Sequence, residues 1–169
     1  YGVCPGKNII LFTNNDDAYK TALVLVNNNK KINCIIDLRP KKENLMIKKI
    51  LSHGIKVFFG YTIRKAYGKK RIEAISIIEV NKKVKKYKKL KCDLLGVSGG
   101  WSPVINLWSH PGGKIFWNER NETFFPKLDS FPKNSNGTQN TIVVGSASGL
   151  SRVNDCINQV SKKINAFIK

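Results

Sequence analysis

The sequence predicts an α/β fold of three layers, in which an antiparallel meander takes the place of one crossover helix of a parallel sheet. Up to residue 59, short apolar runs alternate with helical patterns, which is typical of a βαβαβ order. Three strand patterns at hairpin spacing follow. The apolar run at residues 94–97 then returns the chain to the buried sheet.

The first strand and helix form the unit around which the chain is organised. Residues 9–12 are a continuous apolar run, as expected of a buried parallel strand. Apolar residues then recur at helical spacing over residues 18–26. A polar turn at residues 13–17 separates the two elements, so the stretch has the architecture of the first turn of a nucleotide-binding unit.

The chemistry of this turn differs from that of a nucleotide site. A dinucleotide-binding unit carries G-x-G-x-x-G/A here, where glycines let the pyrophosphate approach a helix N-terminus. Thr13 and Asn15 occupy glycine positions in this chain, and Asp16 and Asp17 stand where a phosphate would arrive. We predict a self-capped turn, in which Asn15 or Asp16 bonds the helix amides that a phosphate would otherwise satisfy.

The second strand, residues 32–36, ends at an acid. Asp37 follows the turn by about twenty residues, which is where a dinucleotide-binding unit contacts a ribose 2′-hydroxyl. Arg39 lies two residues further on. It could favour a 2′-phosphate or simply pair with Asp37, and the residues alone leave both alternatives open.

The remaining elements follow from the same patterns. Apolar residues at 46–51 predict a short helix that ends at Gly54, and residues 55–59 predict a third buried strand. The meander strands are predicted at residues 61–67, 71–80 and 84–92. Beyond a glycine turn at 98–103 we predict a short helix at 104–108, strands at 114–117, 123–125 and 141–144, and a closing helix at 153–167.

The formal net charge of +19 comes from 30 Lys and Arg against 11 Asp and Glu. The densest basic run, residues 81–91, could line a nucleic-acid groove or protect the solvated edge of a hairpin. Most of the basic residues are lysine, and Asn and Ile are also abundant, which an AT-rich coding sequence favours irrespective of function. The composition therefore argues against nucleic acid as the partner.

The chemistry-bearing residue types form no recognisable constellation. Four scattered cysteines include no C-x-x-C, and with two histidines they predict no metal site and a reducing, cytoplasmic compartment. No signal peptide is present, nor an apolar run of the about 20 residues that a membrane span needs. No catalytic residue is predicted. The start at Tyr1 without methionine indicates an excised fragment.

The order of elements resembles the second dinucleotide domain of two-dinucleotide-binding flavoproteins, the group of thioredoxin reductase and glutathione reductase (pyridine nucleotide-disulfide oxidoreductases). Residues 11–18, LFTNNDDA, fit the strand-G-G-G-D-S-A turn of that group in register, with its glycines replaced. Residues 94–107 resemble its return to the FAD domain, and residues 143–146 its late A-x-G-D strand. The flavin-contacting Asp of that motif is Ser146 here, and the redox C-x-x-C is absent.

Three stretches together resemble the α (large) subunit family of heterotetrameric sarcosine oxidases: residues 1–23, residues 92–119 and the GSASG segment at 145–149. The resemblance implies a central segment of a much longer subunit of an oxidoreductase acting on CH–NH donors. That family oxidises sarcosine (N-methylglycine) with FAD, FMN and NAD⁺. Its products are glycine, hydrogen peroxide, and formaldehyde or methylene-tetrahydrofolate.

The resemblance also implies roles for parts of this chain. Residues 1–97 would be a degenerate NAD(P)-binding-like domain, and residues 98–169 the C-terminal part of the first dinucleotide domain, where the family binds NAD⁺. Gly145 and Ser146 would approach the bound dinucleotide, and Gly99 and Gly100 would line the same cleft. FAD lies in the β subunit and FMN at the α–β interface. The partners would be the rest of the α subunit and the β, γ and δ subunits, and the segment alone would be structural and inactive.

Two alternatives stay open. The first is a still-active NAD(P)-binding oxidoreductase domain, with Asp37 on the ribose, Asp16–Ala18 at the helix start and Asn15 as a further cofactor-binding residue. The second is a basic module that binds nucleic acid or a partner protein. Chemical-shift changes at residues 14–17 on adding NAD⁺ would favour the first, and salt-dependent binding to duplex DNA would favour the second.

Overall fold

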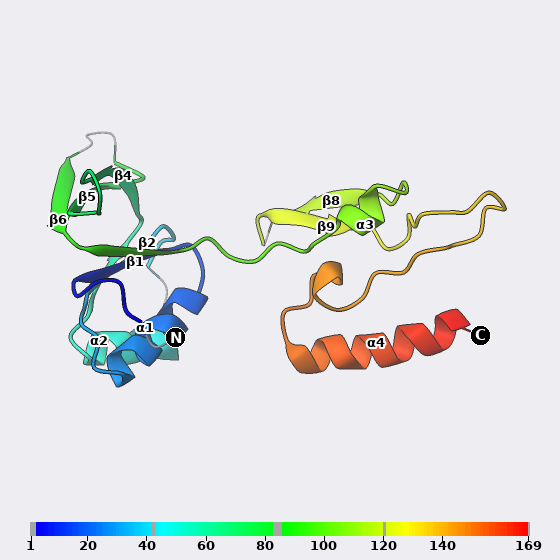
Figure 1. Ribbon diagram of the computed structural model, residues 1–169, viewed down its shortest axis with the longest axis horizontal. Coiled ribbons are helices and arrows are strands. Elements are labelled where there is room, and N and C mark those ends of the chain that lie inside the picture. The colour runs from blue at the N-terminus through cyan, green and yellow to red at the C-terminus, as the bar shows by residue number, and fades with distance from the viewer. Residues whose placement is uncertain (1–2, 42, 83–85, 120, 169) are drawn as a thin grey trace. The chain divides into compact units, whose positions relative to one another are not determined.

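The computed structural model describes residues 3–41, 43–82, 86–119 and 121–168, with side chains as far as Ile164. The chain consists of two compact units, Tyr1–Gly100 and Trp101–Lys169, which we call the N-terminal and C-terminal units (Figure 1).

The N-terminal unit is built on a parallel sheet of four strands in the order β3-β2-β1-β7. All three pairings are parallel, as the alternation of strands and helices predicts. The strands are β1 (Ile9–Thr13), β2 (Ile32–Asp37), β3 (Lys56–Phe59) and β7 (Leu94–Ser98), and the helices are α1 (Asp17–Asn27) and α2 (Leu45–Ser52).

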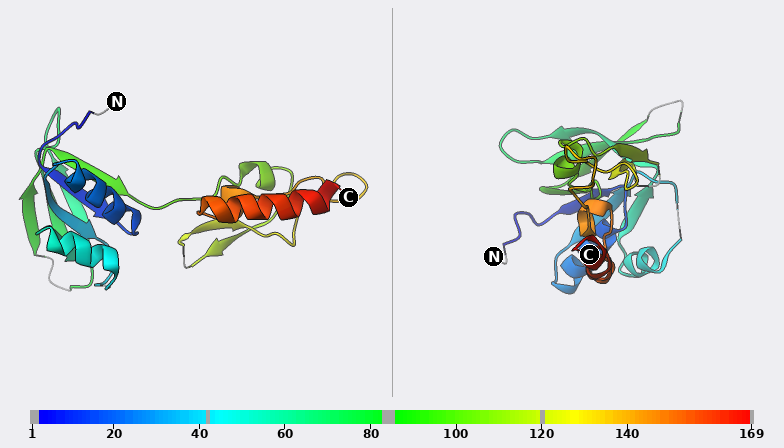
Figure 2. Two further views of the ribbon diagram at one scale, coloured as in Figure 1. Left: turned by 90° about the horizontal axis from the view of Figure 1, so that it is seen from below. Right: turned by 90° about the vertical axis from the view of Figure 1, so that its right-hand side faces the viewer.

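An antiparallel sheet of three strands, in the order β4-β5-β6, connects β3 to β7. Its strands are β4 (Tyr61–Tyr67), β5 (Ala74–Glu79) and β6 (Tyr87–Lys91). It covers the face of the parallel sheet opposite to α1 and α2 (Figures 1 and 2). The predicted three-layer fold with a meander crossover is therefore confirmed.

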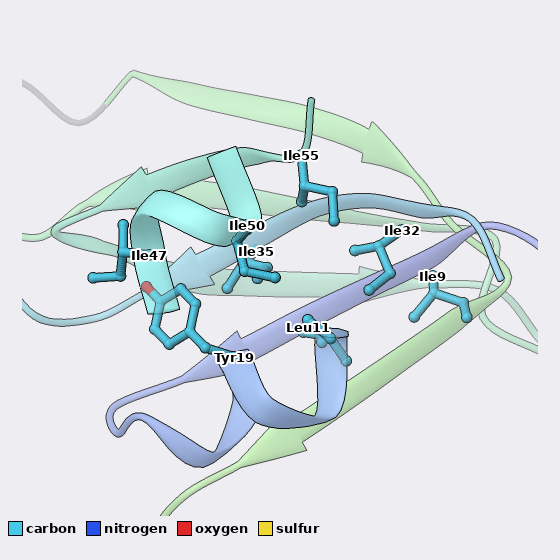
Figure 3. Packing of buried hydrophobic residues seen from close by; sticks show 9 residues of the cluster. Ile9, Leu11, Tyr19, Ile32, Ile35, Ile47, Ile50 and Ile55 are labelled. Carbon is cyan, nitrogen blue, oxygen red and sulfur yellow. The ribbon is translucent and has the colours of Figure 1, made fainter. Parts of the chain in front are cut away.

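Two apolar clusters hold the three layers together. Between the parallel sheet and the helices lie Ile9, Leu11, Tyr19, Ile35 and Ile50, among others (Figure 3). The second cluster joins the other face of the parallel sheet to the meander and contains Ile10, Cys34, Ile36, Ile75, Ile77 and Cys92. Successive residues of β1 thus point to opposite faces of the sheet. Because both faces are covered, the strand is a continuous apolar run in the sequence.

A carboxylate ties the segment before β1 to the start of β7. Asp93 Oδ1 accepts hydrogen bonds from the backbone N–H groups of Lys7 (2.9 Å) and Asn8 (2.7 Å). These backbone donors, that of Asn8 first, hold the pKa of the Asp93 carboxyl below its usual range because they stabilise the ionised form. The carboxylate therefore supports the pairing of β1 with β7.

This tie predicts a pH-dependent effect of Asp93→Asn, which keeps an acceptor oxygen but removes the charge. The folded-state pKa lies below the ordinary value of about 3.9, so the charge stabilises the fold above that value and the effect is lost as pH falls through the lowered pKa. We expect a lower urea midpoint than wild type near neutral pH and equal midpoints in acid. The control Glu43→Gln, at an exposed site, should leave the urea midpoint unchanged both near neutral pH and in acid.

The C-terminal unit contains a hairpin, one turn of helix and a long closing helix. Its elements are α3 (Asn106–Ser109), β8 (Ile115–Asn118), β9 (Thr123–Pro126), the 3₁₀ helix η1 (Gly145–Ser148) and α4 (Val153–Ile168). Aromatic pairs cross the hairpin, Phe116 on Phe125 and Trp117 on Phe124. The predicted strands at 114–117 and 123–125 and the closing helix are confirmed.

The predicted strand at residues 141–144 is wrong. These residues belong to no strand, although Val143 is buried. A strand exists only where a second backbone accepts its hydrogen bonds, and β8 and β9 pair with each other. The described part of this unit supplies no further strand to pair with 141–144. The apolar pattern therefore indicated the burial of Val143 correctly, but it did not indicate that residues 141–144 pair with a strand.

Candidate functional site

The carboxyl ends of β2, β1 and β7 form the edge where an open α/β sheet binds its ligands. Thr13 lies opposite both Asp37 on β2 and Ser98 on β7 in the parallel register. From β1 the chain order runs to β2 on one side and to β7 on the other, which is a topological switch point. The polar residues that follow these strands therefore define the candidate site.

The turn after β1 is closed by its own side chains. The buried Thr13 hydroxyl donates to the carbonyl oxygen of Asn15 (2.9 Å) and accepts from the N–H of Asn15 (3.0 Å). This two-residue loop is a polar turn of the kind that threonine forms with its own backbone. A glycine at position 13 would supply neither bond.

Asn15 uses its whole side-chain amide within the protein. Its Oδ1 accepts from the N–H of Asp17 (2.9 Å) and from the hydroxyl of Ser98 (3.1 Å). Its Nδ2 donates to the carbonyl oxygens of Ser98 (3.0 Å) and of the Asn14 side chain (2.9 Å). Asn15 thus caps the first turn of α1 and joins it to the end of β7. The predicted self-capped turn is confirmed for Asn15.

Asp16 does not cap the helix. It stands at the N-cap position of α1, but its side chain makes no capping hydrogen bond. Its Oδ1 instead accepts from Nη2 of Arg39 at 2.8 Å. This ion pair joins the turn after β1 to the segment after β2, across the edge of the sheet.

Asp37 is buried, with 1% of its surface exposed, and its carboxylate is fully engaged. It accepts from the Tyr19 hydroxyl (2.7 Å) and from three nitrogens of Arg39: the backbone N (3.0 Å), Nε (3.0 Å) and Nη2 (2.8 Å). Arg39 therefore pairs with Asp37, one of the two alternatives that the sequence left open.

The ionisation of the two partners of Asp37 follows from this geometry. Burial, followed by the hydrogen bond to Asp37, raises the pKa of the Tyr19 hydroxyl, so it stays a donor at all ordinary pH. The hydrogen bond to Asp37 also raises the pKa of the Arg39 guanidinium, against the opposing effect of its burial. The Arg39 guanidinium therefore keeps its charge and the Tyr19 hydroxyl keeps its proton beside Asp37.

The residues at this edge do not fit a bound dinucleotide. The amide that a pyrophosphate oxygen would accept from, that of Asp17, already bonds Asn15. Asp16 and Asp17 add carboxylates there, and a like-charge contact at ~4 Å costs about 1–4 kcal/mol in water or at a protein surface. The acceptor atoms of Asp37 are taken by Tyr19 and Arg39, so no oxygen is free for a ribose hydroxyl.

Gly99 and Gly100 are exposed and lie beside this turn. Gly100 has φ +92°, and a Cβ atom at that position would lie 3.7 Å from Nδ2 of Asn15 and 3.9 Å from Oδ1 of Asn14. The structure thus brings the predicted Gly99–Gly100 loop together with the predicted Asn15. Only glycine readily adopts this backbone conformation.

Gly145 and Ser146 belong to the C-terminal unit and form the start of η1. The N–H of Gly145 donates to Oε1 of Gln159 at 2.7 Å, and the Ser148 hydroxyl donates to the same oxygen at 2.9 Å. A ligand at the Gly145 amide would have to replace this bond. The proposal that Gly99, Gly100, Gly145 and Ser146 line one cleft stays a prediction.

Tyr19 and Gln159 are site residues that the sequence patterns missed. Tyr19 stands among the apolar core-facing positions of α1, between Ala18 and Ala22. A hydroxyl-bearing aromatic at such a position requires a polar partner, and that is the signal that could have found it. Gln159 carries no such signal, because its partners, the Gly145 N–H and the Ser148 hydroxyl, lie on a distant segment that no local pattern connects to it. Within the described residues, no His, Cys, Asp and Glu side chains gather as a possible metal site.

Replacing Asn15 by alanine should destabilise the N-terminal unit by about 1–2 kcal/mol, the usual cost of losing a helix cap. The loss of the bonds to Ser98 places the effect at the upper end of that range. Urea unfolding followed by far-UV circular dichroism measures it, and the amide of Asp17 should exchange faster. Asn14→Ala is the control, and an equal effect of both substitutions would contradict the capping role of Asn15.

Solved structures define the class to which this fold belongs. No protein-family model matches the chain. Thioredoxin reductase of T. acidophilum superposes on 96% of the chain with a TM-score of 0.65 at 14% identity, and 53% of that protein is covered. Bacillithiol disulfide reductase of Staphylococcus aureus gives a TM-score of 0.69 at 11% identity over 96% of the chain and 52% of that protein. The fold is that of thioredoxin reductase-like NAD(P)/FAD-binding proteins.

Curated relatives narrow this class. The α subunit of sarcosine oxidase from Rhizobium meliloti is 26% identical over 176 aligned residues, which cover 100% of this chain and 15% of that subunit. The same subunit from Corynebacterium sp. (strain P-1) is 26% identical over 130 residues, 75% of this chain and 13% of its own length. The predicted resemblance to sarcosine oxidase α subunits is therefore confirmed. The chain spans about 15% of the length of the curated relatives that it matches.

Proposed function

We propose that this chain is a structural and cofactor-supporting segment of a flavoenzyme subunit that oxidises sarcosine. The parent enzyme removes the N-methyl group of sarcosine by oxidation and forms glycine, hydrogen peroxide, and formaldehyde or methylene-tetrahydrofolate. NAD⁺ belongs to the parent α subunit, and FMN and FAD lie elsewhere in a complex with β, γ and δ subunits in the cytoplasm. The similarity to sarcosine oxidase α subunits over the whole chain supports this assignment.

The state of the turn after β1 carries the non-catalytic part of the proposal. The Asn15 side chain accepts from the Asp17 N–H, a donor that a phosphate would otherwise use. Arg39 pairs with Asp37, and the Tyr19 hydroxyl donates to it. The nucleotide-type fold is thus kept while its hydrogen-bonding groups are satisfied internally. A still-active NAD(P)-binding domain would need these bonds broken and two carboxylates accommodated beside a pyrophosphate.

The proposed domain division assigns residues 1–97 to the degenerate NAD(P)-binding-like domain and residues 98–169 to part of the first dinucleotide domain. Exposed apolar side chains of the C-terminal unit support an incomplete domain. They include Trp101 (80% exposed), Val104 (74%), Leu107 (83%) and Val153 (73%). So much exposed apolar surface is typical of a face that another polypeptide segment covers. Residues 141–144 belong to no described strand, so a further strand of the parent subunit would find a partner there once the Gln139 side chain releases the Thr141 carbonyl oxygen (2.7 Å).

The reaction is tested on the full α subunit assembled with its partner subunits. We expect sarcosine-dependent release of hydrogen peroxide, and faster turnover of another N-methyl or cyclic amino acid would replace the proposed substrate. No helix that the structure describes has both the length and the apolar character needed to cross a lipid bilayer.

A substitution at the turn tests the non-catalytic role separately. Asp17→Asn removes one carboxylate from the start of α1. If NAD⁺ lay at this turn, the loss of about 1–4 kcal/mol of repulsion would tighten its binding several-fold or more. We expect the NAD⁺ affinity and the turnover of the assembled enzyme to stay within twofold of wild type. Tighter binding, or NAD⁺-induced shifts at residues 14–17, would overturn the proposal.

A further inference from the structure

The meander carries a large share of the positive charge. Residues 61–92 hold twelve of the 30 Lys and Arg and two of the 11 acids. One of these acids, Glu79, is already engaged, because it pairs with Lys82 at 2.8 Å and accepts from the Tyr61 hydroxyl at 3.3 Å. Acidic residues of the meander therefore neutralise little of its positive charge.

Strand register places several of these cations on one face. Leu90 packs into the core between the meander and the parallel sheet, so its neighbours Lys89 and Lys91 point to the opposite, outer side. Ser76 of β5 lies between Lys65 of β4 and Lys89 of β6 in one cross-strand row. We call Arg64, Lys65, Tyr67, Tyr87, Lys89 and Lys91 the outer basic face.

Aromatic rings hold three of these cations in place. Nζ of Lys65 and Nζ of Lys89 lie 5.4 and 4.5 Å from the centre of the same ring, that of Tyr67. The guanidinium of Arg64 lies 5.2 Å from the ring centre of Tyr87. Cation–π contacts at these distances are attractive and order otherwise mobile side chains. The four cations of the outer basic face, the three above and Lys91, are exposed. None of them takes part in an ion pair between described residues.

The free edge of β6 adjoins this face. Among the described strands β6 pairs with β5 alone, so its other edge is open to a further strand, except that the Lys91 carbonyl oxygen already accepts from Nδ2 of Asn33 at 3.4 Å. An extended segment added there places every second side chain on the outer side, opposite Lys89 and Lys91. Lysines on an edge discourage pairing with a neutral or basic strand. The edge therefore selects a strand whose alternate residues are acidic.

We propose that the outer basic face and the free edge of β6 together dock an extended acidic segment of a partner protein. The rings argue for a protein rather than a nucleic acid, because non-specific single-stranded binding uses open aromatic faces for base stacking. The rings of Tyr67 and Tyr87 already carry cations. This site is independent of the proposed enzyme function, since it uses neither the turn after β1 nor a cofactor.

The test compares two pairs of charge removals with the same change in net charge. Lys65→Gln with Lys89→Gln alters the outer basic face, and Lys30→Gln with Lys31→Gln alters exposed lysines between α1 and β2. The probe is a synthetic peptide of alternating glutamate and valine, titrated at about 0.15 M salt. We expect the first pair to weaken binding about tenfold or more and the second less than twofold, with unchanged urea midpoints. Amides of β6 should exchange more slowly when the peptide is bound.

Equal weakening by both pairs would show that only net charge matters and would overturn the site, as would no binding of the wild-type protein at this salt. Faster or unchanged exchange of the β6 amides in the complex would overturn strand addition at the edge. A duplex DNA of equal charge that binds more tightly than the peptide would make the face a nucleic-acid surface instead.

Discussion

Replacing Arg39 by methionine should destabilise the N-terminal unit by about 3 kcal/mol, the largest effect that we expect from a residue at the carboxyl edge of the sheet. Asp37 would keep its burial and its bond to Tyr19 but lose the bidentate partner that neutralises it. Breaking a buried ion pair by removing one member typically costs about 3–5 kcal/mol. The partial exposure of Arg39 places the cost at the lower end of this range.

Urea unfolding by far-UV circular dichroism measures the effect, supported by faster exchange of the β2 amides. Arg71→Met, at an exposed arginine, is the matched control and should change stability by less than about 0.5 kcal/mol. The double variant Asp37→Leu with Arg39→Met should recover part of the loss, because replacing both members of a buried pair by apolar groups is often close to neutral. Equal effects of Arg39→Met and Arg71→Met would contradict the proposed role of the pair.

Gly149→Ala should destabilise the C-terminal unit by about 3 kcal/mol. Gly149 has φ +97°, and its Cβ atom would overlap the Phe125 ring. A left-handed residue with a Cβ costs about 1–2 kcal/mol, and overpacking a well-filled site costs about 1–3 kcal/mol more. The substitution therefore forces β9 away from the end of η1.

Gly137→Ala separates the two contributions. Gly137 also has a positive φ, +77°, but a Cβ atom there meets nothing within 4 Å. It should cost only the conformational part, about 1–2 kcal/mol. All three tryptophans, Trp101, Trp108 and Trp117, lie in the C-terminal unit, so tryptophan fluorescence during urea unfolding reports on this unit. Equal losses at Gly149 and Gly137 would show that Phe125 yields without cost.

The turn after β1 satisfies its own hydrogen-bonding groups where a dinucleotide-binding turn leaves them to a phosphate. A glycine-rich turn leaves helix amides open to a phosphate, whereas Asn15 satisfies the Asp17 amide permanently and also braces β7 through Ser98. These internal bonds stabilise the turn without a ligand. They are compatible with Asp16 and Asp17 at a position where a dinucleotide-binding turn presents donors.

The sequence by itself determined the order of elements in the N-terminal unit, because apolar periodicity and hairpin spacing are local properties. It also determined that the turn after β1 lacks glycine, and it predicted a cap by Asn15 or Asp16, of which the structure shows Asn15. The resemblance to sarcosine oxidase α subunits likewise came from residue patterns alone.

Only the tertiary structure decided which polar groups meet. Tyr19 reaches Asp37 because α1 packs over β2, and no local pattern specifies that contact. The bond between Gly145 and Gln159 depends in the same way on the packing of α4 against η1. The pairing of Arg39 with Asp37 is local, but the sequence left it as one of two alternatives. Residues 141–144 have the apolar pattern of a strand but no partner, since strand pairing is a property of two distant segments and not of one.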